Sequence, residues 1–154
     1  MNVGVFGLGS MGYGMAISLL RAGHSVWGFD TVATQVDKFV SEGGFSDDIA
    51  AAVPDLDVVV IVVLNAAQTE SVLFGNNGIA AYMKSASTAI SCATVALVFA
   101  PGMAAQCKAS ELFYLDVPLP VLALTAAAGK RVAVCSGRPV PFSTTPLAGG
   151  YLAR

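Results

Sequence analysis

Six residues near the amino terminus have the types and the spacing of a site that holds the pyrophosphate of a dinucleotide. They follow the pattern G-x-G-x-x-G and are Gly7, Leu8, Gly9, Ser10, Met11 and Gly12. In such a turn the first glycine permits a tight bend and the second lets the backbone approach the pyrophosphate. The third lets a helix pack closely on a strand. The amide groups and the dipole at the start of that helix would then attract the anion.

Asp30 is the second residue with chemistry suited to such a ligand, because it stands at the end of a predicted strand, 18 residues after Gly12. A carboxylate at this position can accept both ribose hydroxyls of NAD and would repel the additional phosphate of NADP. The next residues, Thr31, Val32 and Ala33, supply no arginine for that phosphate. The pattern therefore predicts NAD rather than NADP. The alternatives are a glycine turn that only joins a strand to a helix, and a solvated loop carboxylate.

The elements around these residues alternate between strand and helix. A strand over 2–6 leads into the glycine turn and a helix, which ends before Gly23. The β-branched run over 58–64 shows no alternation of apolar and polar residues, which is typical of a parallel strand buried on both faces. The other predicted strands are 25–29, 87–92, 112–115 and 131–135, and the other predicted helices are 34–42, 46–53 and 95–109. The pattern predicts an α/β fold with a doubly wound, mostly parallel sheet of the Rossmann type.

Composition limits the classes of protein to which the chain can belong. Its 154 residues are 55% hydrophobic and 12% charged, with a formal net charge of -2, which argues against disorder and against nucleic acid as a partner. The uncharged stretches 1–20 and 85–107 are interpreted as buried elements and not as membrane spans. The cysteines are widely spaced, which indicates neither a metal site nor a disulfide framework and favours a reducing, cytoplasmic compartment. They are Cys92, Cys107 and Cys135.

Residues 3–30, with the glycine motif and the Ala-Gly-His sequence at 22–24, resemble the amino-terminal signature of the β-hydroxyacid dehydrogenases. This family includes 3-hydroxyisobutyrate dehydrogenase, tartronate semialdehyde reductase and L-threonate dehydrogenase. The resemblance continues through residues 62–70, 92–96 and 114–118, and covers residues 1–137 in all. The wording Asn-Ala-Ala-Gln-Thr-Glu within it is most similar to the L-threonate dehydrogenase branch.

The resemblance implies that Leu64 and Asn65 line the nicotinamide side of the cofactor and that Thr94 also contacts it. The alternatives are core packing for Leu64 and a helix N-cap for Thr94. His24 is interpreted as a turn residue and Asp116 as a structural residue at a strand end.

The chain departs from the family in two places. After Asp116 the family has a glycine-rich loop that holds the substrate carboxylate, whereas residues 117–122 here read Val-Pro-Leu-Pro-Val-Leu and should bind it poorly. The family also has a helical second domain that supplies a catalytic lysine and mediates dimerisation, and the chain ends before it. Lys108 and Lys130 are interpreted as solvated charges, so the catalytic residue stays unknown.

These observations predict a dinucleotide-binding domain over 1–137 and an irregular tail, rich in proline and glycine, over 138–154. The first hypothesis is the NAD-binding domain of an oxidoreductase that transfers a hydride between a 3-hydroxy acid and NAD, truncated and incomplete for catalysis. A second domain would complete the site for the small hydroxy acid, and a homo-oligomer is expected. The alternative is a non-catalytic module that binds NAD or docks a partner. A third hypothesis is an incompletely folded product that associates through an uncovered apolar face.

Overall fold

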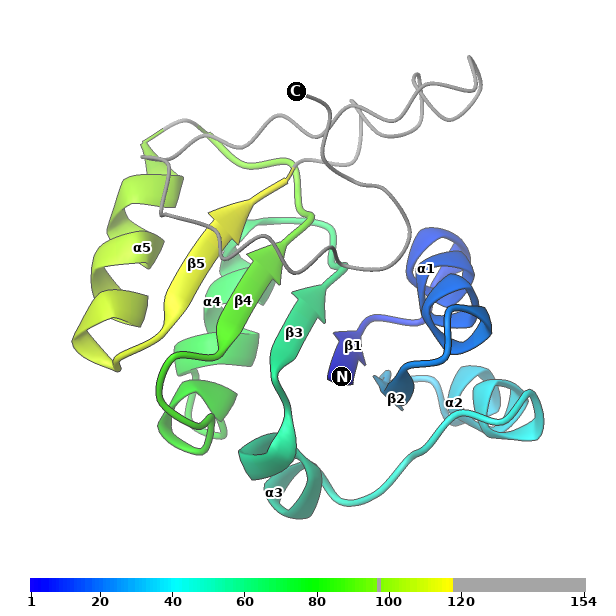
Figure 1. Cartoon of the computed structure of the whole chain (residues 1–154). Coiled ribbons are helices and arrows are strands. Elements are labelled where there is room, and N and C mark those ends of the chain that lie inside the picture. The colour runs from blue at the N-terminus through cyan, green and yellow to red at the C-terminus, as the bar shows by residue number, and fades with distance from the viewer. Residues whose placement is uncertain (97, 118–154) are drawn as a thin grey trace.

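The computed structural model describes residues 1–96 and 98–117 (Figure 1). Several predictions made from the sequence lie outside these residues. They concern the loop after Val117, Lys130, the strand 131–135, Cys135, the tail 138–154 and hence the domain boundary at 137.

Five parallel strands form one sheet in the order β2-β1-β3-β4-β5. They are β1 (Asn2–Phe6), β2 (Ser25–Phe29), β3 (Val58–Ile61), β4 (Thr88–Ser91) and β5 (Phe113–Asp116). The chain runs from β1 outward to β2 and then returns across β1 to β3, so the direction of winding reverses between β1 and β3. In sheets of this kind the ligand crevice lies at that reversal, beyond the carboxyl ends of the strands. The predicted α/β fold with a doubly wound parallel sheet is confirmed.

Helices cover both faces of the sheet: α1 and α2 lie on one side, and α4 and α5 on the other (Figure 1). They are α1 (Ser10–Arg21), α2 (Ala33–Ser41), α3 (Ile49–Ala52), α4 (Ala66–Phe74) and α5 (Phe99–Ala109), with the 3-10 turns Val53–Asp55 and Ile79–Ala81. Within β3, Val58 and Val60 join the core beneath α1 and α2, while Val59 and Ile61 join the core beneath α4 and α5. Both faces of β3 are therefore apolar, as the unbroken β-branched run predicted.

Three elements have a boundary that differs by more than one residue from the one predicted. The strand expected over 58–64 ends at Ile61. The helix expected over 46–53 covers only Ile49–Ala52, because Phe45 extends the sheet: its N–H donates to the Val26 carbonyl, and its own carbonyl accepts from Gly28 N, each at 2.9 Å. The helix expected from residue 95 begins at Phe99. Pro101 then lies in the first turn, where its missing N–H costs little and no bend is needed.

In the described residues no helix is long and apolar enough to cross a membrane. The uncharged stretch 1–20 forms β1, the glycine turn and most of α1, and the stretch 85–107 includes β4 and most of α5.

Candidate cofactor site

Gly7 forms the bend directly after β1 and has a positive φ of 99°. A Cβ atom there would lie 2.2 Å from the carbonyl oxygen of Val62, which follows β3. The Gly7 N–H also donates to the Phe29 carbonyl at 2.8 Å. The bend is thus packed against the ends of both neighbouring strands, and only glycine fits it.

Gly9 and Gly12 fill the two other positions that the motif assigns to glycine. A Cβ atom at Gly12 would lie 1.8 Å from the Gly7 carbonyl oxygen, so α1 packs directly on the turn. A Cβ atom at Gly9 would meet no atom of the described residues within 4 Å. The space over Gly9 leaves its backbone open to a ligand. Gly9 is also the N-cap of α1, which has no side-chain capping bond and no acidic residue in its first turn. The first amide groups of α1 are therefore available to an anion.

The other three members of the motif divide between core and surface. Leu8 is fully buried, so its side chain anchors the turn and only its backbone can face a ligand. Ser10 is exposed, and the Met11 side chain is 42% exposed. The structure therefore places Ser10 and Met11 at the open start of α1.

Asp30 lies just beyond β2, and its carboxylate accepts two backbone hydrogen bonds. Oδ2 accepts from Leu8 N at 2.6 Å and Oδ1 from Val32 N at 2.9 Å. The first bond joins the end of β2 to the glycine turn, a link that sequence reasoning did not foresee. Each carboxylate oxygen can accept a further hydrogen bond, so the ribose hydroxyls still have acceptors. Asp30 is half-buried and bonded, which contradicts the alternative of a solvated loop carboxylate.

Leu64 and Asn65 lie in the turn that joins β3 to α4. The Leu64 side chain is 83% exposed, which contradicts the alternative of core packing. Asn65 is the N-cap of α4, and its Oδ1 accepts from Gln68 N at 3.0 Å. Gln68 Oε1 in turn accepts from Leu64 N at 2.9 Å. Neither the helix α4 nor a role for Gln68 was predicted from the sequence, although an asparagine followed three residues later by glutamine is a known signal for a helix start.

Thr94 is exposed and lies between β4 and α5. The N-cap of α5 is Val98, so the alternative of Thr94 as the N-cap of this helix is wrong. All the predicted cofactor residues follow the carboxyl ends of the parallel strands β1 to β4 and share one edge of the sheet.

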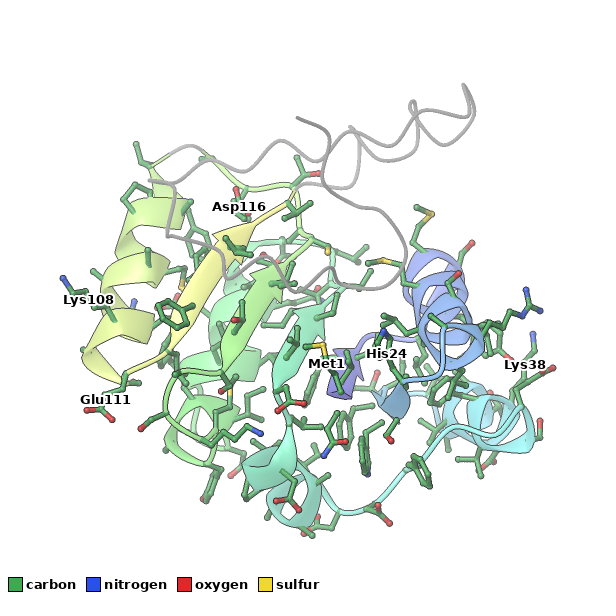
Figure 2. All side chains as sticks on the ribbon, in the orientation of Figure 1. Met1, His24, Lys38, Lys108, Glu111 and Asp116 are labelled. Carbon is green, nitrogen blue, oxygen red and sulfur yellow. The ribbon has the colours of Figure 1, made fainter. Side chains whose placement is uncertain are left out.

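Among residues 1–96 and 98–117, the remaining lysines, cysteines and the histidine offer no nucleophile near this edge. His24 precedes β2, and Lys108 lies on the outer side of α5 (Figure 2). Burial raises the pKa of Cys92 to about 12, with a smaller contribution from the Asp116 charge, and burial raises the pKa of Cys107 to about 11. Both thiols stay protonated at neutral pH and therefore are not nucleophiles. Among the described residues no group of three metal-binding side chains occurs.

Comparison with known families supplies the observation that decides the identity of this fold. A family described as the NAD binding domain of 6-phosphogluconate dehydrogenase matches residues 2–145. The chain belongs to this family. NAD, the cofactor predicted from the sequence, is accordingly the cofactor of the matched domain.

The relatives of the chain include L-threonate dehydrogenases. The chain is 36% identical to L-threonate dehydrogenase of Escherichia coli K12 over 92% of its own length and 47% of that protein. It is 40% identical to the enzyme of the same name from Cupriavidus necator, over 92% of this chain and 48% of that protein. The chain thus spans about half the length of these relatives. The predicted resemblance to the β-hydroxyacid dehydrogenases, nearest the L-threonate dehydrogenase branch, is confirmed.

A solved structure supports the same assignment. The crystal structure of a 3-hydroxyisobutyrate dehydrogenase from Salmonella typhimurium is 37% identical and superposes with a TM-score of 0.78, over 89% of this chain and 48% of that one.

Proposed function

We propose that the chain is the NAD-binding part of an oxidoreductase that transfers a hydride between a 3-hydroxy acid and NAD. The supporting observation is that two groups suited to a dinucleotide lie next to each other. The amide groups at the start of α1 have no side-chain cap and suit the pyrophosphate, and Asp30, which suits the ribose, is hydrogen-bonded to the turn that precedes them. The family relationship and the hydroxy acid dehydrogenases among its relatives support the reaction class.

In this proposal, residues at the carboxyl ends of the strands bind different parts of NAD. The pyrophosphate is held by the amide groups around Gly9, and the adenosine ribose by Asp30. Leu64, Asn65 and Thr94 lie at the ends of β3 and β4, on the other side of the reversal, and contact the nicotinamide half. The bound NAD supplies the hydride acceptor. NAD is preferred to NADP, because the Asp30 carboxylate would repel a phosphate on the ribose.

The proton acceptor for the substrate hydroxyl is assigned to a part of the protein outside the described residues. Within them, Lys84 forms an ion pair with Asp57 before β3, Lys38 lies over the Tyr13 ring, and Lys108 is exposed on α5. None of these lysines follows the carboxyl end of a strand. The alternative function, a non-catalytic module that binds NAD or docks a partner, rests on this observation.

Calorimetry and an activity assay test both functions. Titration of the 154-residue chain with NAD should give one site, and NADP should bind more weakly. With L-threonate or 3-hydroxyisobutyrate the chain alone should form no NADH above background. Steady turnover by the chain alone would contradict the assignment of the base, and an absence of NAD binding would refute both functions.

The proposal also includes a cytoplasmic location and a homo-oligomeric state. Free, buried thiols at Cys92 and Cys107 support a reducing compartment. Sedimentation analysis with and without NAD tests the oligomeric state, and a monomer under both conditions would contradict it.

A further inference from the structure

The turn after β3 is closed by two hydrogen bonds that involve one glutamine. The side chain of Gln68 accepts from Leu64 N, and its backbone N–H donates to the Asn65 side chain, at 2.9 and 3.0 Å. Gln68 therefore bonds to both residues that precede α4. We call residues 64–68, closed in this way, the β3–α4 bracket.

The bracket is attached to the protein core by the next residue. Thr69 is fully buried, and both its N–H and its hydroxyl donate to the Asn65 carbonyl, at 3.1 and 3.2 Å. Asn65 is thus held by the two hydrogen bonds from Thr69 to its carbonyl and by the hydrogen bond from Gln68 N to its side chain. Leu64 lies outside the helix, and its backbone N–H is held by the hydrogen bond to the Gln68 side chain.

The topology shows which half of a dinucleotide the bracket would meet. Asp30 follows β2 on one side of β1, and the glycine turn follows β1 itself. The bracket follows β3 on the other side of β1, where Gly7 packs against Val62. A ligand with its ribose at Asp30 and its pyrophosphate over Gly9 extends next over β3. The exposed Leu64 side chain therefore lies on the nicotinamide side.

We propose that Gln68 is a positioning residue, which holds the Leu64 backbone so that the Leu64 side chain contacts the nicotinamide half of NAD. This inference rests on the proposed function, since it requires NAD at the carboxyl edge of the sheet. Gln68 acts through Leu64 and does not itself touch the reacting atoms.

The test compares NAD with ADP, which lacks the nicotinamide half but fills the ribose and pyrophosphate positions. Both are titrated calorimetrically into the full chain and into Gln68→Ala, Gln68→Glu and Gln106→Ala. Loss of one hydrogen bond of ordinary strength predicts that Gln68→Ala weakens NAD binding by about three- to tenfold. ADP binding should change by less than about twofold, because the bonds of Gln68 go to Leu64 and Asn65, whereas those of Asp30 go to Leu8 and Val32.

Two variants separate positioning from a general effect on the fold. Gln68→Glu keeps an acceptor for Leu64 N, so it should restore the ratio of the ADP and NAD dissociation constants. Gln106→Ala makes the same change at an exposed position of α5 and should alter neither constant. If Gln68→Ala weakens NAD and ADP equally, or weakens neither, the inference is overturned while the proposed function stands. If the unmodified chain binds neither ligand, both are overturned.

Discussion

Asp30 should stabilise the protein even when no cofactor is bound. In the structure its two oxygens accept from Leu8 N and Val32 N, so its removal leaves two amide groups without this acceptor. A hydrogen bond to a charged group contributes about 1.5–3 kcal/mol. The Val32 bond is exposed and water can replace it, so most of the loss comes from the part-buried Leu8 N–H.

The expected loss of unfolding free energy is about 2 kcal/mol for Asp30→Ala and about 1 kcal/mol for Asp30→Asn. The asparagine variant loses less because its remaining oxygen can still accept from Leu8 N. Urea denaturation at pH 7 without NAD measures both values. Asp37→Asn removes the same charge at an exposed position of α2 and is the matched control, expected to change stability by less than about 0.5 kcal/mol.

NAD binding supplies the second readout for the same variants. Asp30→Asn should weaken NAD binding by about tenfold, since a charged acceptor for the ribose hydroxyls is lost. If NAD affinity falls while both Asp30 variants keep the stability of the unmodified chain, Asp30 serves the ribose alone. A role of Asp30 in fixing the glycine turn would then be refuted.

Two further predictions concern the turn and the opposite edge of the sheet. Gly12→Ala should lower the unfolding free energy by at least about 2 kcal/mol, because its Cβ atom would lie 1.8 Å from the Gly7 carbonyl oxygen. Gly14→Ala, where a Cβ atom meets no atom within 4 Å in the part of the chain that the structure describes, should instead raise it by about 0.5–1 kcal/mol, and thermal denaturation of both variants tests the contrast. The hydrogen bond from Lys84 lowers the pKa of Asp57 in the folded protein. The pair therefore stabilises the fold fully at a pH above the pKa that Asp57 has in the unfolded chain. This stabilisation is lost as the pH falls through the lower pKa of Asp57 in the folded protein. Both side chains are partly exposed, so Lys84→Met should cost at most about 1 kcal/mol at pH 7 and less at pH 3; an equal loss at both pH values in urea denaturation would contradict the assignment.

The sequence was most informative where a residue type follows from local geometry. The glycines of the motif could be assigned because each fills a position that a side chain would block or must leave open. The strands could be assigned because burial on both faces requires unbroken apolar runs. The Rossmann architecture and the position of Asp30 were therefore predictable from the sequence.

Two features could not be predicted from the sequence. The hydrogen bond between Leu8 and Asp30 depends on a contact between residues far apart in the sequence, and the start of α4 is masked by the apolar run that precedes it. The bond from Leu8 to Asp30 joins residues 22 apart and requires the pairing of β1 with β2, which no local pattern records. The start of α4 was hidden because the apolar run before it continues to Leu64, whereas the strand pairing ends at Ile61. The signal that could have revealed this helix was the spacing of Asn65 and Gln68.

The pairing of Phe45 with β2 also affects how this protein can be studied. This pairing occupies backbone groups of β2, a strand at the edge of the sheet, that would otherwise be free to pair with another molecule and cause aggregation. The only tryptophan of the chain, Trp27, stacks on Phe45 with ring centroids 5.0 Å apart and donates to Asp47 at 2.8 Å. The intrinsic fluorescence of Trp27 therefore reports whether Phe45 is still paired with β2. Shortening the segment around Phe45 should change the emission spectrum and reduce the yield of dispersed protein together.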